Sequence, residues 1–101
     1  MTQLSDNSKA YYDSLEKLRA HMKLRVEDIL QIIEVSRPAY YGWRNGRKMN
    51  SISSRKALGA ISILLKIAKD PEWKKWEGQH LTIWKRKEIL DLLLAREVVS
   101  H

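Results

Sequence analysis

The stretch that decides the fold runs from Arg25 to Arg47 and reads RVEDILQIIEVSRPAYYGWRNGR. Its apolar residues recur at helical spacing on both sides of an interruption at residues 34–36, which predicts two short helices joined by a tight turn. Ser36 is a favourable N-cap, and Pro38 falls in the first turn of the second helix, where its missing N–H costs nothing. We therefore expect a helix over about 36–45.

Two aromatic residues are expected to anchor this second helix. Tyr40 and Trp43 are three residues apart and therefore share one helical face, which predicts that both are buried. Gly42 lies between them, and a glycine inside a helix costs about 1 kcal/mol relative to alanine. Its presence indicates that another group approaches the backbone closely there.

Helical patterns also precede and follow this stretch. A helix is expected from about Ser8, residues 49–54 are expected to form a loop, and Ser53 or Ser54 is expected to cap the next helix. Pro71 to Gly78 is consistent with a short helix, and Thr82 can cap a last one. The expected apolar stripes are Tyr11, Leu15, Leu18 and Met22 in the first helix, and Leu58, Ile61, Leu65 and Ala68 in the fourth.

These patterns predict an all-α protein, a compact helical bundle with a C-terminal helical extension. We divide the chain into a main domain over residues 1–79 and a C-terminal helix over residues 80–101. The core of that helix, Ile89 to Ala95, is apolar almost all the way round. A helix of this kind is either deeply buried or shared with a partner.

The positive charge of the chain lies in its middle third. The net charge is +7, and residues 35–69 carry eight basic residues and no acidic residue, whereas the flanking segments are close to neutral. The eight are Arg37, Arg44, Arg47, Lys48, Arg55, Lys56, Lys66 and Lys69. A localised basic field is typical of a site for a polyanion. The alternative is a solvated basic surface without a partner.

Several classes of protein are disfavoured by the composition. The chain has no cysteine, which excludes disulfides and zinc–thiolate sites and fits a cytoplasmic location. The histidines at 21, 80 and 101 share no metal-ligand spacing, so we expect neither a metal nor another cofactor. We find no nucleophile motif or glycine-rich phosphate loop and expect no enzymatic activity. No secretory signal and no apolar run long enough to cross a membrane are present.

Residues 26–47 resemble the helix-turn-helix of the Cro/CI-type (Xre-like) transcriptional regulators, the lambda-repressor-like DNA-binding domain, and the likeness continues to about residue 69. The matching residues are Glu27, Asp28 and Ile29, then Val35, Ser36 and Arg37, then Tyr40, Trp43 and Gly46, and finally Ala57, Leu58 and Ile61. Three positions depart from the pattern. Leu30 replaces a small residue, Glu34 replaces the turn glycine, and Val26 replaces a glutamine that often contacts phosphate.

The resemblance implies that the helix over 36–45 lies in the DNA major groove. Arg37 is the best candidate to read a base, because a guanidinium can bond guanine bidentately, and the alternative is that it touches only phosphate. Tyr41 contacts DNA or is a partly exposed packing residue. Candidate base-contacting residues are Arg37, Pro38, Ala39, Tyr41 and Gly42. Candidate phosphate-contacting residues are Ser36, Arg44, Asn45, Arg47, Lys48, Arg55 and Lys56, the alternative being unengaged surface charge.

Regulators of this kind read two half-sites of a palindromic operator, which requires a dimer. We assign homodimerisation to the last helix, and the alternative is that it packs wholly on its own domain. The residues assigned are Trp84, Ile89, Leu90, Leu93 and Leu94.

The sequence therefore predicts a dimeric, sequence-specific regulator that binds double-stranded DNA, most simply a repressor in a bacterial cell or a phage-infected host. One alternative is an antitoxin-type autorepressor whose C-terminal helix binds a protein partner. Another is a binding module whose basic face contacts RNA or an acidic protein.

Overall fold

The computed structural model describes residues 7–99, which form six α-helices and no strand. The helices are α1 (Ser8–Met22), α2 (Val26–Ile33), α3 (Arg37–Arg44), α4 (Ser51–Lys69), α5 (Pro71–Trp76) and α6 (Ile83–Val99). The all-helical prediction is confirmed. None of the helices in the described range is long and apolar enough to cross a membrane.

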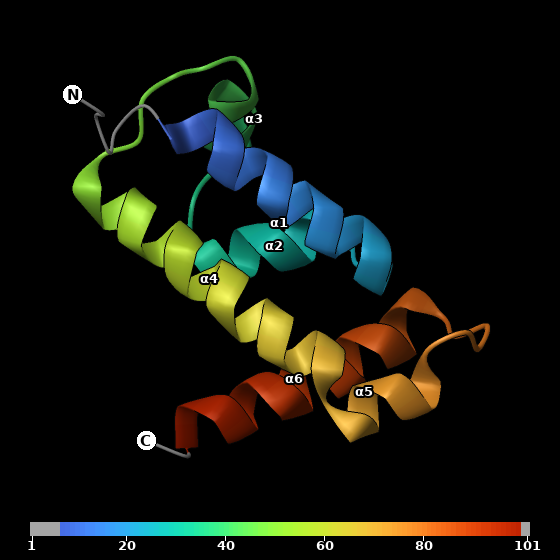
Figure 1. Cartoon of the computed structure of the whole chain (residues 1–101). Coiled ribbons are helices and arrows are strands. Elements are labelled where there is room, and N and C mark those ends of the chain that lie inside the picture. The colour runs from blue at the N-terminus through green and yellow to red at the C-terminus, as the bar shows by residue number, and fades with distance from the viewer. Residues whose placement is uncertain (1–6, 100–101) are drawn as a thin grey trace.

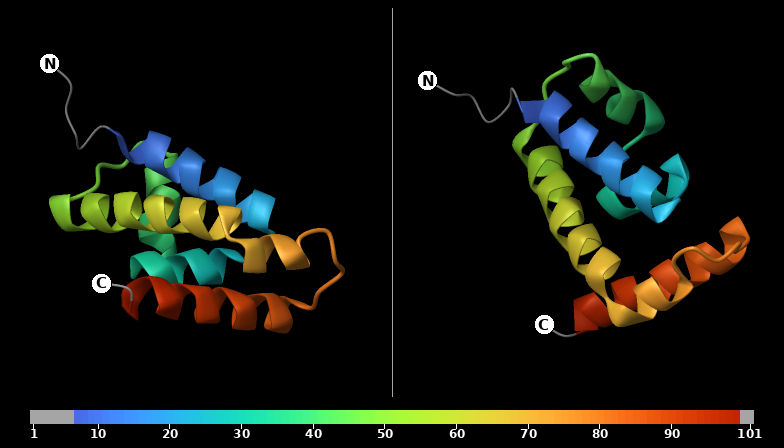
Figure 2. Two further views of the ribbon diagram at one scale, coloured as in Figure 1. Left: turned by 60° about the horizontal axis from the view of Figure 1, so that its bottom comes forward. Right: turned by 45° about the vertical axis from the view of Figure 1, so that its right-hand side comes forward.

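Helices α1 and α4 lie side by side and run in the same direction (Figure 1). Helix α3 packs beside the N-terminal half of α1, and α5 and α6 lie at the far end of α4 (Figure 1). In the left view of Figure 2, α6 lies beneath α2 and α4. The basic helix α3 is therefore at one end of the molecule, and the C-terminal helix is on another side.

One apolar core joins all six helices. It contains Leu15 of α1, Ile29 of α2, Tyr40 of α3 and Leu64 of α4, each with no exposed surface. Trp73 of α5 and three residues of α6 belong to the same cluster. On α1 the buried face is centred on Tyr12, Leu15 and Met22, whereas Tyr11 and Leu18, which the sequence pattern placed inward, are only half-buried.

The helix ends follow local rules. The backbone N–H of Arg25 donates to the Asp28 carboxylate at 3.0 Å, and the Arg25 guanidinium donates to the same carboxylate at 3.2 Å, which fixes the start of α2. The expected cap of α3 is confirmed, because Ser36 Oγ accepts from the Ala39 N–H at 3.3 Å. Thr82 Oγ1 accepts from the Lys85 N–H at 3.1 Å, as predicted for the start of the last helix.

The prediction for the start of α4 is wrong. The expected loop over residues 49–54 is helical from Ser51 onward, and the cap is Asn50 rather than Ser53 or Ser54. The Asn50 side chain accepts from the Ser53 N–H at 2.7 Å. Asparagine is as favourable at an N-cap as serine, so the residue types alone do not show which of Asn50, Ser53 and Ser54 begins the helix.

The buried face of α4 is also rotated by one residue from the predicted stripe. The buried residues are Ala57, Ala60, Leu64 and Ile67. Leu58, which we expected inside, is 53% exposed, Leu65 is also exposed, and Ile61 and Ala68 are half-buried. The two stripes adjoin on one broad apolar face. The alanines at the centre of the buried stripe have small side chains, so neighbouring helices can approach α4 closely.

The C-terminal helix packs on its own chain. Ile89, Leu90 and Leu93 lie in the common core with 5% or less of their surface exposed, so their assignment to a dimer contact is wrong for this conformation. Leu94 is half-buried against the same core. The sequence pattern suggested more apolar surface than one groove could cover; α6 packs against α4, and Leu92 is left exposed. Of the five assigned residues, Trp84 alone is largely exposed, at 68%.

Candidate nucleic-acid interface

Six of the eight basic residues in the acid-free segment gather at one end of the molecule. They lie on α3, on the loop that follows it, and on the first two turns of α4. The six are Arg37, Arg44, Arg47, Lys48, Arg55 and Lys56, all exposed except Lys56, which is half-buried. Lys66 and Lys69 lie roughly 15–20 Å further along the axis of α4. Six basic residues of the segment thus form a basic surface around α3, and Lys66 and Lys69 lie outside it.

Tyr40 fixes the orientation of α3 against α1. Its ring is fully buried, with its centroid 4.8 Å from that of Tyr12 and 5.9 Å from that of Trp43. Its hydroxyl donates to Glu16 Oε2 at 2.7 Å. Burial and the Glu16 carboxylate raise the pKa of Tyr40, so the hydroxyl remains a donor. The predicted burial of Tyr40 and Trp43 is confirmed, and it turns the opposite face of α3 outward.

The outward face of α3 carries the residues that the resemblance assigned to base contacts. Arg37 and Pro38 are exposed, and Ala39, Tyr41 and Gly42 are half-buried. The ring of Tyr41 lies 5.1 Å from the guanidinium carbon of Arg44, a cation–π distance. The assigned phosphate-contacting residues Ser36 and Asn45 are exposed at the two ends of the helix. Each of these residues therefore has exposed or partly exposed surface on α3 or at one of its ends.

Arg37 is not a free cation. Its Nη2 donates to Glu27 Oε2 in a short ion pair between the starts of α3 and α2. Both side chains are about half exposed, at 45% for Arg37 and 57% for Glu27. A backbone hydrogen bond and the Arg37 guanidinium lower the pKa of Glu27, so the carboxylate stays ionised.

Gly42 allows a basic side chain to lie across α3. A Cβ at this position would be 3.1 Å from Cδ of Arg47, closer than most real contacts. The backbone N–H of Arg47 also donates to the carbonyl oxygen of Gly42 at 2.9 Å. The close approach predicted from this glycine is therefore made by the protein itself, and it places the Arg47 guanidinium beside the outward face of α3.

The turn between α2 and α3 uses a residue that is not glycine. Glu34 has φ 57° and ψ 48°, the left-handed conformation that glycine adopts most readily. Its carboxylate forms an ion pair with Lys56 of α4 at 3.0 Å. The glutamate that replaces the turn glycine of the helix-turn-helix pattern thus adopts a strained backbone conformation, and its side chain links the turn to α4.

Two residues near this surface were not among the candidate DNA-contacting residues. Arg25 caps α2, and its guanidinium carbon lies 5.4 Å from the centroid of the Trp84 ring, so the start of α6 is held beside the start of α2. The resemblance includes Glu27 as a matching position but assigns it no contact with DNA or with another residue. Its contact with Arg37 joins residues ten positions apart across a turn, and no local sequence pattern indicates such a pair.

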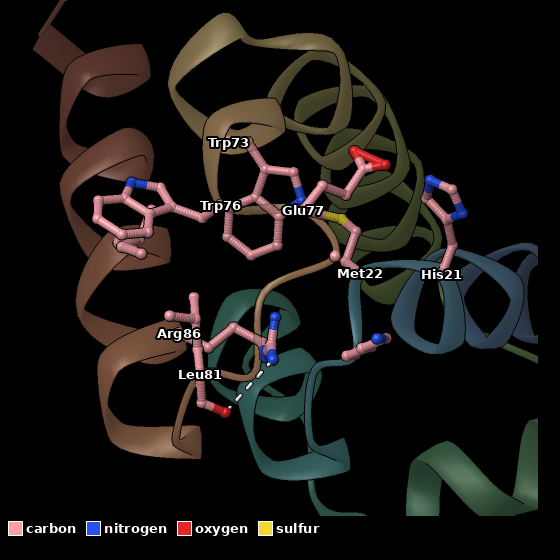
Figure 3. Close-up of a pocket in the computed structure, with 10 residues that line it drawn as sticks. His21, Met22, Trp73, Trp76, Glu77, Leu81 and Arg86 are labelled. Carbon is pink, nitrogen blue, oxygen red and sulfur yellow. Dashed lines mark hydrogen bonds between the residues drawn. The ribbon is translucent and has the colours of Figure 1, made fainter.

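A small cavity lies between the end of α1, α5 and the start of α6. This cavity, of about 20 Å³ among Met22, Trp73, Trp76 and their neighbours, is large enough for about one water molecule (Figure 3). Arg86 lies at its edge and donates to the carbonyl oxygen of Leu81 at 3.5 Å (Figure 3). Within residues 7–99, no three histidine or acidic side chains gather in a way that could hold a metal ion.

Comparisons with known proteins leave the family open. No protein-family model matches the chain, and no match was found among curated proteins or among solved structures.

Proposed function

We propose that this protein is a sequence-specific, double-stranded DNA-binding transcriptional regulator, most simply a repressor, in which α2 and α3 act as a helix-turn-helix. The observation that carries the proposal is the orientation of α3. Tyr40 and Trp43 face the core, so the face with Arg37, Pro38 and Tyr41 is outward. That face lies at the centre of a basic surface to which the acid-free segment contributes six cations.

The dimensions of α3 suit the major groove. An α-helix with its side chains is about 10–12 Å across, close to the width of the major groove of about 12 Å, and the eight residues of α3 extend about 12 Å along the helix axis. With α3 in the groove, Arg37 would bond a guanine edge, and Pro38 and Ala39 would be near thymine methyl groups. The cations after α3, from Arg47 to Lys56, would contact phosphates and set the register of the protein on the duplex.

Homodimerisation remains part of the proposal, with a corrected surface. Because Ile89, Leu90 and Leu93 are buried, the contact would use the outer face of α6, where Leu92 is 65% exposed and Trp84 is also exposed. Positions 84 and 92 are eight residues apart, which is about 80° around a helix of 3.6 residues per turn, so both can lie on its outer side. Two copies joined in this way would read two half-sites of a palindromic operator.

Selection of bound fragments from a pool of random duplex DNA tests the proposal directly. A palindromic consensus is the expected result, because it reflects both base reading and pairing of two copies. Binding should also fall on the order of a thousandfold between about 50 and 200 mM salt, as expected for six or more phosphate contacts. Recovery of no consensus, with no duplex binding at low salt, would refute the proposal.

Two variants separate the assigned roles. Arg37→Ala should relax the sequence preference, whereas Arg47→Ala should weaken binding to all duplexes about equally and reduce the salt slope by about 1. If both variants weakened every duplex equally, the assignment of Arg37 to base reading would be wrong.

An antitoxin-type autorepressor is the second candidate. The exposed Trp84 and Leu92 on α6 favour it, because a protein partner could cover the same surface that a second copy would use. Co-expression with the product of the neighbouring gene, followed by purification through a tag on this chain alone, distinguishes the two. A stoichiometric complex that is lost in a Leu92→Glu variant would support the antitoxin, and a homodimer alone would contradict it.

A further inference from the structure

Two carboxylates stand within the basic surface around α3. Although residues 35–69 contain no acid, Glu27 and Glu34 reach this surface from α2 and from the turn. Each forms an ion pair with one basic side chain, Glu27 with Arg37 and Glu34 with Lys56. Among the described residues, no comparable ion pair is made by the four other cations, Arg44, Arg47, Lys48 and Arg55.

The Glu27–Arg37 pair restricts the guanidinium without using all of its donors. The bond to Glu27 is made by Nη2, Tyr41 is a second hydrogen-bonding neighbour of the guanidinium, and an arginine has five N–H donors in a rigid fork. The remaining donors can still bond the O6 and N7 atoms of guanine, the usual bidentate partner of arginine in the major groove. Glu27 therefore holds the long side chain of Arg37 near one position while leaving it able to read a base.

The same carboxylate opposes contact with the DNA backbone. Glu27 is 57% exposed and stays ionised, so a phosphate brought to Arg37 would also be brought to a negative charge. A guanine edge carries no net charge and is not repelled in this way. An unpaired arginine at the start of α3 would be attracted to any phosphate within reach, whatever the sequence.

We propose that Glu27 is a positioning residue that makes Arg37 selective for a guanine base over phosphate. This inference rests on the proposed function and deepens it, since it assigns the ligand of this part of the surface as a duplex with guanine at the Arg37 position. Glu34 has a different role, because its partner Lys56 lies on α4 and is assigned to phosphate.

The test compares two duplexes of the same length and composition, the one selected by the wild-type protein from the random pool and a scrambled version of it. Glu27→Gln removes the charge and keeps the shape of the side chain. It should bind the scrambled duplex about 3–10 times more tightly and steepen the salt slope by about 0.9. Because the affinity for the selected duplex should stay nearly the same, the ratio between selected and scrambled duplex should fall by the same factor.

Glu34→Gln is the matched control, because it removes the same charge beside another cation of the same surface. It should raise affinity for both duplexes alike and leave their ratio unchanged. In an Arg37→Ala background, Glu27→Gln should no longer change the ratio, because the side chain that it positions is absent. Thermal unfolding of each variant shows that the fold is retained.

The outcomes separate this inference from the proposed function. A wild-type protein that binds no duplex, or binds both equally, would refute the proposed function and this inference with it. A wild-type protein that discriminates, while Glu27→Gln keeps the same ratio, would refute the role of Glu27 alone. If Glu34→Gln lowered the ratio between selected and scrambled duplex as much as Glu27→Gln, the role of Glu27 would also be refuted. The effect would then come from the loss of a negative charge anywhere on the surface.

Discussion

Replacing Tyr40 by phenylalanine tests how α3 is held in place. The change removes one hydroxyl from the contact between α1 and α3 and leaves the buried ring unaltered. That hydroxyl donates to Glu16 Oε2 at 2.7 Å, and the same carboxylate accepts from Arg19 Nε at 3.0 Å and Nη2 at 2.8 Å. The variant therefore weakens one arm of a three-residue network without opening a cavity.

The expected loss of stability depends on the hydrogen-bond partners that Glu16 keeps in the variant. A hydrogen bond to a charged group contributes about 1.5–3 kcal/mol, and its loss is most costly when the acceptor is left unsatisfied. Glu16 keeps Arg19, and its side chain is 24% exposed to water. We therefore expect Tyr40→Phe to lower the free energy of unfolding by about 1–2 kcal/mol. In a domain of this size the melting temperature should fall by roughly 5–12 °C.

The cost should also depend on pH. Burial alone would raise the pKa of Glu16, but hydrogen bonds from Arg19 and Tyr40 outweigh it and lower the pKa below its ordinary value of 4.5. A carboxyl with a lowered pKa in the folded state stabilises the protein above its unfolded pKa. That stabilisation is lost as the pH falls through the folded pKa. The difference between wild type and Tyr40→Phe should therefore shrink well below pH 4.5.

Urea unfolding followed by the fluorescence of the four tryptophans measures both effects. Tyr11→Phe is the matched control, because Tyr11 is half-buried on α1, the helix that carries Glu16, and makes no side-chain hydrogen bond to another described residue. Its effect should stay within about 0.5 kcal/mol. A Tyr40→Phe variant as stable as the Tyr11→Phe control, or one whose cost is the same in acid as at neutral pH, would refute the role given to the Tyr40 hydroxyl.

Three further predictions concern packing and the outward face of α3. In urea unfolding, Leu64→Ala should lower the free energy of unfolding by about 2–5 kcal/mol, and Leu58→Ala should lower it by less than about 1 kcal/mol. The reverse order would mean that the stripe predicted from the sequence, which contains Leu58, is the buried one. Leu93→Ala should destabilise the monomer similarly, whereas Leu92→Ala should leave unfolding unchanged and weaken self-association in sedimentation equilibrium. Gly42→Ala should stabilise the helix by up to about 1 kcal/mol yet weaken duplex binding, because its Cβ displaces the basic side chain that lies over it. Equal duplex affinity for Gly42→Ala and wild type in a titration would contradict that arrangement.

Capping residues and the spacing of apolar residues in the sequence determined where most of the helices lie. Ser36 and Thr82 cap the helices that they were expected to cap, because an N-cap needs only a side-chain acceptor a few residues before a helix. The burial of Tyr40 and Trp43 also followed from sequence, since two large aromatic residues three apart define one face. Likewise, the concentration of positive charge in residues 35–69 depends on composition alone.

Only the tertiary structure decided which of two adjoining stripes on α4 is buried, and whether Leu93 faces its own core or a partner. Such choices depend on the approach of helices distant in sequence, and helical periodicity alone does not contain that information. The pairing of Glu27 with Arg37 is of the same kind. The turn at Glu34 brings the starts of α2 and α3 within reach of each other, and it thereby places the Glu27 carboxylate beside the arginine that begins α3.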